Sequence, residues 1–107
     1  MPDLAVVDLS WAGRLRNGNP STAAIVAACV GDQVRLLHDG QSWMIENQNG
    51  VQLARMAKAW SPPDGRRFVR GTIGAVIIWK KTDNAEEYRA YILRERWEVV
   101  LPELVFE

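Results

Sequence analysis

The chain has 107 residues, which suffices for one domain with a hydrophobic core that needs neither a metal nor disulfides. Apolar residues make up 48% and charged residues 24% of the chain, and this composition excludes an intrinsically disordered protein. Thirteen basic and thirteen acidic side chains give a net charge of zero, so the total charge alone gives no sign of a polyanionic partner. No apolar run approaches the length of a membrane span.

Two features bear on the compartment. The single cysteine, Cys29, cannot form an internal disulfide, which fits a reducing environment. The start, Met1-Pro2-Asp3, lacks the basic segment of a secretory signal. We expect a cytoplasmic protein.

The first 29 residues are expected to form a lead-in to the main part of the domain. Leu4–Leu9 is short and apolar, which suits a strand or an extended segment. Gly13–Thr22 holds a cluster of turn-forming residues and predicts a loop. The alanine-rich segment Ala23–Cys29 predicts a short helix that Ser21 or Thr22 would cap.

A three-stranded meander is predicted next. Asp39-Gly40 and Asn49-Gly50 each accommodate the positive φ angles of a tight hairpin turn. The strands that these turns join are Gln33–His38, Ser42–Asn47 and Val51–Arg55. Within the second strand, alternation places Trp43 and Ile45 on one face.

In the following segment two prolines separate a predicted helix from a predicted strand. Ala54–Trp60 favours one or two helical turns by propensity, and Pro62-Pro63 would end them. Phe68–Trp79 then predicts a central strand because its second half is almost wholly apolar. Gly71 and Gly74 within this strand indicate a bulge or a close backbone approach.

The last third is predicted to end at a sheet edge. Thr82–Glu87 is polar and suits a hairpin tip, and Tyr88–Val100 fits one long kinked strand or a helix followed by a strand. Pro102 is expected to interrupt the chain before Leu104–Phe106, an edge strand or extended tail. Together the elements predict a mainly β domain, a small partly open barrel of five to seven strands with one or two short helices, in which residues 30–107 form the β-rich core.

Catalytic signals are weak. His38, the only histidine, lies beside Asp39-Gly40 and is interpreted as an exposed turn residue, whereas Cys29 has no neighbouring base and is expected to be a buried, inert thiol. One cysteine and one histidine cannot supply the usual zinc ligands. The sequence contains no phosphate-binding loop and no dinucleotide-binding glycine motif. We therefore expect no enzyme activity, no metal and no cofactor in this chain alone.

The neutral total conceals a basic segment. Residues 55–81 hold seven basic side chains against one acid, a local charge of about +6, and the same window holds Trp60, Phe68 and Trp79. Basic side chains interleaved with aromatics suit a nucleic acid whose bases stack. The residues expected to contact it are Arg55, Lys58, Trp60, Arg66, Arg67 and Arg70.

The alternative is that these charges are paired across the surface with acids such as Glu86, Glu87, Glu95 and Glu98, and that the tryptophans lie in the core. Trp43, Trp79 and Trp97 are assigned to the interior, and Trp60 is the best candidate for an exposed platform. A continuous positive groove would favour DNA, whereas mixed charges around an apolar patch would favour a protein partner.

Three parts of the chain resemble a known family: Val30–Leu36, Gly50–Gly65 with Gly74–Ile78, and Arg94–Phe106. They resemble the extreme C-terminal segment of bacterial RecQ-like ATP-dependent DNA helicases. The order of strand, turn, Leu53-Ala54-Arg55 and Pro62-Pro63-Asp64-Gly65 is also similar to HIRAN-type modules, small β-barrels of DNA-processing enzymes. The resemblance spans residues 30 to 106, and its most specific part is Trp97–Phe106.

The resemblance implies a non-catalytic accessory domain that binds DNA, and a nucleoid-associated, monomeric protein. ATP and Mg²⁺ would belong to a motor domain outside this chain, and the partners would be DNA with that motor or a repair protein. The alternative function is a protein–protein docking module of a repair helicase without DNA contact. Its surface would be the edge of Leu101–Phe106 or an apolar patch around Met44 and Met56.

Overall fold

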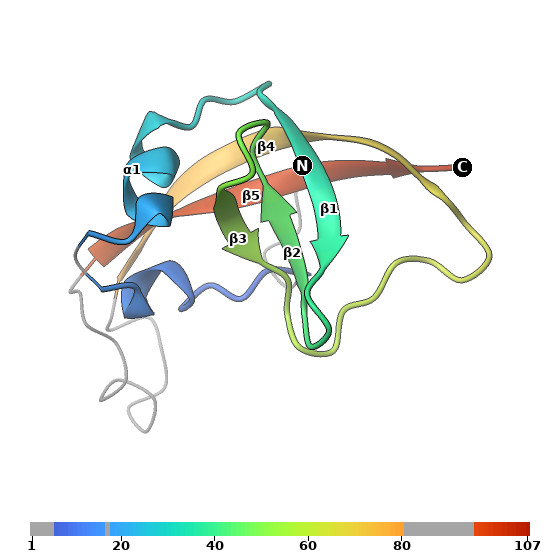
Figure 1. The fold of residues 1–107 in the computed structure, drawn as a ribbon, viewed down its shortest axis with the longest axis horizontal. Coiled ribbons are helices and arrows are strands. Elements are labelled where there is room, and N and C mark those ends of the chain that lie inside the picture. The colour runs from blue at the N-terminus through green and yellow to red at the C-terminus, as the bar shows by residue number, and fades with distance from the viewer. Residues whose placement is uncertain (1–5, 17, 81–95) are drawn as a thin grey trace.

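The computed structural model describes residues 6–16, 18–80 and 96–107 and shows five antiparallel strands that curl into a half-barrel (Figure 1). The helical elements are a 3-10 helix, η2 (Ala12–Arg14), and one α-helix, α1 (Pro20–Ala27). The strands are β1 (Gln33–His38), β2 (Trp43–Glu46), β3 (Gln52–Arg55), β4 (Phe68–Lys80) and β5 (Arg96–Phe106). This mainly β, partly open barrel confirms the predicted fold class. None of the helices described is both long and apolar enough to cross a membrane.

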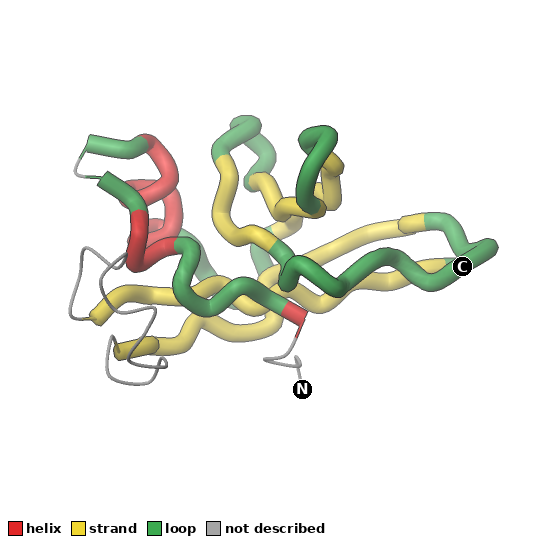
Figure 2. Tube along the Cα trace, turned by 90° about the horizontal axis from the view of Figure 1, so that it is seen from below, coloured by secondary structure: helices red, strands yellow, loops and turns green. Residues whose placement is uncertain are grey.

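The sheet has the strand order β3-β2-β1-β4-β5. β1, β2 and β3 form the predicted meander, and Gly40 and Gly50 adopt φ angles of 96° and 79° in its two turns. β4 then returns by a long connection to lie beside β1, which gives the Greek-key order. Figure 2 shows β4 and β5 as one long ribbon, with the meander and the helices on the same side of it.

The β4–β5 hairpin confirms both predictions for its glycines. The register shifts between Ile73 and Ala75, which makes Gly74 the extra residue of a bulge. A Cβ atom on Gly71 would lie 2.9 Å from Leu104 Cδ2 and 3.0 Å from Val34 Cγ2, so the absence of a side chain permits the close approach of three strands.

The interruption expected at Pro102 is wrong, because β5 runs through it as one strand. The amides of Arg67 and Glu107 each donate to the other's carbonyl, at 3.0 and 2.9 Å. The backbone N–H and C=O groups of successive residues in a strand point alternately to its two sides. Since those of Glu107 point toward Arg67 and β4, those of residues 102, 104 and 106 point toward the free edge of β5. The missing N–H of Pro102 therefore removes no bond to β4, and an edge strand tolerates it.

Two helix predictions are also corrected. Ala54–Trp60 contains the end of β3 and a turn rather than a helix, because burial of Leu53, Ala54 and Met56 in the sheet outweighs their helical propensity. The real helix begins earlier than expected, at Pro20. Its cap is Asn19, whose side chain accepts a hydrogen bond from the Ser21 amide at 2.8 Å, and proline suits the first helical position.

The N-terminal segment closes one side of the half-barrel. Val7 bridges to Met56 beyond β3, and Trp97 of β5 donates its indole Nε1–H to the Leu9 carbonyl at 2.7 Å. Trp97 is 5% exposed, as predicted for an interior residue, while Trp43 and Trp79 are half-buried. The N-terminal segment therefore packs against the strands and completes the hydrophobic core.

The packing of Gly13 against this indole gives a stability prediction. A Cβ atom on Gly13 would lie 2.8 Å from the rigid Trp97 ring, so Gly13→Ala is expected to destabilise the domain by about 1–3 kcal/mol. Urea unfolding followed by circular dichroism measures the change. Ala59→Ser, at an exposed turn position, is the control, and an unchanged midpoint for Gly13→Ala would contradict the prediction.

Candidate nucleic-acid interface

Arg55 belongs to a structural ion cluster rather than to an open surface. Its guanidinium forms an ion pair with the Asp8 carboxylate, to which Arg55 Nε also donates at 3.0 Å. Arg14 donates to the same carboxylate oxygen at 2.8 Å, and Ser10 Oγ donates to its other oxygen at 3.0 Å. The cluster ties the N-terminal segment to β3, so Arg55 holds the fold together.

The pKa of Asp8 reflects this cluster. Burial of the carboxyl acts to raise its pKa, but the hydrogen bond from Arg55 and the charges of Arg14 and Arg55 outweigh burial and lower it. A carboxyl whose pKa is lower in the folded than in the unfolded state stabilises the fold above its unfolded pKa. That contribution is lost as the pH falls below about 4 and passes through the folded value.

The cluster predicts an acid-sensitive stability. Wild-type protein should lose part of its unfolding free energy as the pH falls below about 4, the unfolded pKa of an aspartate, and Asp8→Asn should lack that part of the loss. At neutral pH, Arg55→Ala should cost about 1–3 kcal/mol because it removes charge-assisted hydrogen bonds. Urea unfolding across this pH range is the measurement, with exposed Lys58→Ala as the control. Equal stability of Arg55→Ala and Lys58→Ala at pH 7 would refute the assignment.

Trp60 packs in an aromatic cluster, whereas Lys58 is exposed. Trp60 is half-buried and meets Trp43 edge to face, with ring centroids 6.3 Å apart. His38 packs on Trp43 in the same manner, at 4.9 Å. Lys58 is exposed on the turn after β3 and lines none of the grooves described below. The predicted exposed platform at Trp60 is therefore part of an aromatic cluster.

His38 and its neighbours have the turn role that was predicted. The His38 side chain is exposed, and its Nδ1 accepts a hydrogen bond from the Gly40 amide at 3.1 Å. Asp39 Oδ1 accepts from the amides of Ser42 and Gln41, at 2.7 and 2.9 Å, and these bonds lower the pKa of its carboxyl.

Arg66 and Arg67, although adjacent, lie in different surroundings. Arg67, just before β4, forms an ion pair with Glu107, just after β5. Arg66 is exposed on the turn that Gly65 makes with a φ of 70°, and no ion pair holds it among the residues described. It lines a groove of about 440 Å³ between the proline-containing loop and the aromatic rings of Trp43, Phe68 and Phe106. We call this the aromatic groove.

Arg70 lies in a second groove, where β1 and β4 separate. The two strands pair only at Gln33 with Thr72 and at Val34 with Gly71. Beyond these pairs they diverge, and a groove of about 500 Å³ opens between Arg35 on β1 and Arg70 on β4. We call this the arginine groove.

The arginine groove is polar and only partly neutralised. Arg70 is exposed and has no ion pair among the described residues, and Arg35 meets Glu46 at 3.6 Å while staying 55% exposed. Gln48 Nε2 donates to Gln33 Oε1 across the groove wall. The other side-chain atoms of this pair, Gln33 Nε2 and Gln48 Oε1, have no hydrogen-bond partner in the part of the chain that is described.

Shared residues connect these grooves to a third. Phe68 lines both the aromatic and the arginine groove. Gln33 and Gln48 line both the arginine groove and a groove of about 750 Å³ between the alanine face of α1 and the β2–β3 turn. Each of the other two grooves thus shares at least one lining residue with the arginine groove, and we call the three together the path. Asp64 and Asp32 lie at its two outer parts, so positive charge is concentrated around Arg35 and Arg70.

Of the six predicted residues, only Arg66 and Arg70 reach this path. Sequence reasoning missed Arg35, Gln33 and Gln48, since they lie outside the basic segment and the local charge gave no signal for them. Phe68 was noted as an aromatic within the basic window, and its position between two arginines was the available clue.

Other predictions change with the structure. Cys29 is exposed rather than buried, and Met56 is 2% exposed, which removes the proposed Met44 and Met56 docking surface. No group of three or more histidine, cysteine or carboxylate side chains suited to a metal occurs among the described residues. The acids expected to balance the basic segment, Glu86, Glu87 and Glu95, lie outside the described residues, and Glu98 forms no ion pair within them.

Comparison of the chain with protein-family models, with curated proteins and with solved structures finds no match.

Proposed function

We propose that this domain binds single-stranded DNA along the connected grooves, as a non-catalytic accessory domain. One observation carries the proposal: Arg35 and Arg70 face the same groove from two diverging strands, and Phe68 connects that groove to an aromatic one. Guanidinium groups recognise phosphate through paired N–H donors, and neighbouring arginines can hold successive phosphates of one strand.

The neighbouring side chains supply contacts to bases. Phe68, Trp43 and Phe106 present ring surface in the aromatic groove, and stacking on an aromatic ring contributes about 1–3 kcal/mol per base whatever the base. Gln33 Nε2 and Gln48 Oε1, which take no part in the hydrogen bond between the two side chains, match the acceptors and donors of base edges. Bases are accessible in this way only when they are unpaired, which favours a single strand.

The architecture agrees with such a role by analogy. Five-stranded, partly open Greek-key barrels include folds that bind oligonucleotides on their surface. A fold alone does not assign function, so the analogy adds only to the argument from the grooves. The helicase context rests on the resemblance of residues 30–106, and within it this domain would hold the strand that a motor in the same polypeptide moves.

The main prediction concerns the arginine groove. Arg35→Ala with Arg70→Ala should weaken binding of fluorescein-labelled oligothymidine at least about tenfold, as expected for the loss of two phosphate contacts. The slope of log K against log salt should fall by about 0.7 per lost contact. Fluorescence anisotropy at several salt concentrations measures both quantities.

The control removes the same charge elsewhere. Arg16→Ala with Lys58→Ala leaves the grooves intact, and both side chains are exposed. Binding that falls equally in the two double variants would mean that only overall charge attracts DNA, and an unchanged affinity in Arg35→Ala with Arg70→Ala would reject the groove. A variant with Arg66→Ala added should lose a further contact.

A second prediction tests stacking. Phe68→Leu keeps an apolar side chain in the groove wall but removes the ring, so affinity for the same oligonucleotide should fall about fivefold to a hundredfold with little change in the salt slope. Trp79→Phe, which alters a half-buried aromatic residue that lines none of these grooves, should bind as the wild type does. Loss of salt dependence in Phe68→Leu would show instead that the substitution displaces the arginines.

A further inference from the structure

The helix α1 exposes apolar side chains on its outer side. A surface helix normally turns charged or polar side chains to water, but α1 has no charged residue and exposes Ala23, Val26 and Ala27. Val26 alone is 67% exposed. Exposed apolar side chains that lie together commonly mark a contact with another molecule.

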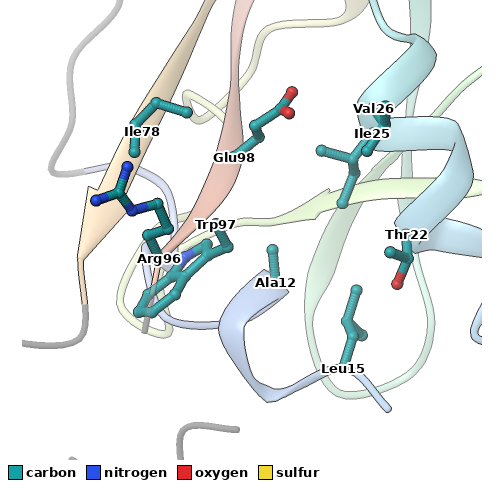
Figure 3. Close-up of a pocket in the computed structure, with 9 residues that line it drawn as sticks. All are labelled: Ala12, Leu15, Thr22, Ile25, Val26, Ile78, Arg96, Trp97 and Glu98. Atoms are coloured by element: carbon teal, nitrogen blue, oxygen red, sulfur yellow. The ribbon is translucent and has the colours of Figure 1, made fainter. Parts of the chain in front are cut away.

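A second exposed apolar side chain lies across a hollow from Val26. The hollow has a volume of about 200 Å³ and lies between α1 and the ends of β4 and β5 (Figure 3). Ile78 borders it from β4 and is 57% exposed. The hollow shares no lining residue with the three connected grooves, so its surroundings are a separate part of the surface.

Two opposite charges border the same hollow. Arg96 and Glu98 lie two residues apart on one face of β5, about 6.6 Å along the strand. Neither forms an ion pair, with the other or with any residue that the structure describes. Figure 3 shows both on the strand side of the hollow, with Val26 on the helix side. We call the side chains of Val26, Ile78, Arg96 and Glu98 the rim surface.

We propose that the rim surface binds a second copy of this chain in a symmetric dimer. In an interface with two-fold symmetry, each contact between two different residues occurs twice, once in each direction. Arg96 would therefore meet the partner's Glu98, while Glu98 meets the partner's Arg96. A surface that carries one charge of each sign beside exposed apolar side chains complements itself in this way, which favours a second copy over an unrelated protein.

The size of the rim surface predicts a weak dimer. It comprises one helix of eight residues and the ends of two strands, whereas stable interfaces between proteins bury at least about 1,200 Å² in total. Smaller interfaces belong to transient complexes, so the dimer should form only at high concentration. This differs from the monomer that the resemblance implies. It is also independent of the proposed DNA binding, because the rim surface lies outside the grooves.

Sedimentation velocity without nucleic acid tests the proposal. The wild-type chain should change from monomer toward dimer between about 10 µM and 1 mM, the range of weak complexes. Val26→Asp should raise the dissociation constant at least about tenfold, because it would bury an unpaired charge in the interface. The control Val105→Asp makes the same change at an exposed valine about 30 Å along β5 from Arg96, and it should associate as the wild type does.

Charge reversal tests whether the partner is a second copy. Arg96→Glu gives the rim surface two acids and Glu98→Arg gives it two bases. Each variant alone should associate at least about tenfold more weakly than the wild type, since like charges would face each other. An equimolar mixture of the two variants has opposite charges at both contacts and should dimerise again.

A second mixture controls for net charge. Lys58→Glu and Glu103→Arg change the net charge by the same amounts as the two reversals, at exposed positions outside the rim surface. Each should associate as the wild type does, alone and in the mixture. Circular dichroism of all variants shows whether they are folded.

Three results would overturn the dimer. One is a wild-type chain that stays monomeric up to about 1 mM, which would assign the rim surface to another segment of the chain or to a different protein. Another is wild-type association of Arg96→Glu and Glu98→Arg, each measured alone. The third is an equal loss of association in Val26→Asp and Val105→Asp.

Discussion

The short contact between β1 and β4 is the constraint on which the rest of the structure depends. Two residue pairs join β1 to β4, and Gly71 lies in one of them; Gly31 and Asp32, just before β1, add two backbone hydrogen bonds to Ile73. The small size of Gly71 lets Val34 and Leu104 pack against the strand, and this brings three strands together at one position. Beyond it, the strands diverge, so the same contact that joins the two halves also opens the arginine groove.

The meander and the hairpin were predictable because their signals are local. Asp39-Gly40 and Asn49-Gly50 define two turns by backbone conformation, and the apolar run after Phe68 is long enough to specify β4. The false helix at Ala54–Trp60 and the interruption expected at Pro102 arose from local preferences that tertiary pairing overrides. Met56 is buried by its bridge to Val7, and Pro102 lies where its missing donor costs no bond to β4.

The candidate site was less predictable because it depends on contacts far apart in sequence. Arg55 and Arg70 belong to the same basic segment, yet Arg55 is held by Asp8, 47 residues away, and Arg70 faces the same groove as Arg35 because β4 returns beside β1. A sum of charges along the chain cannot distinguish a guanidinium group that stabilises the fold from one that faces a groove. The partners of each side chain decide this, and they are set by topology.

A neutral protein can therefore still present a positive surface. At physiological salt, charges more than about 8 Å apart are largely screened, so a phosphate responds to the side chains next to it and not to the total charge. Asp8, Glu107 and Glu46 form ion pairs with Arg55, Arg67 and Arg35, whereas Arg70, which faces Arg35 across the groove, has no ion pair among the described residues. Pairing of some arginines leaves the others as a small, localised positive region. A strand would consequently be bound at the arginine groove and not along the whole surface.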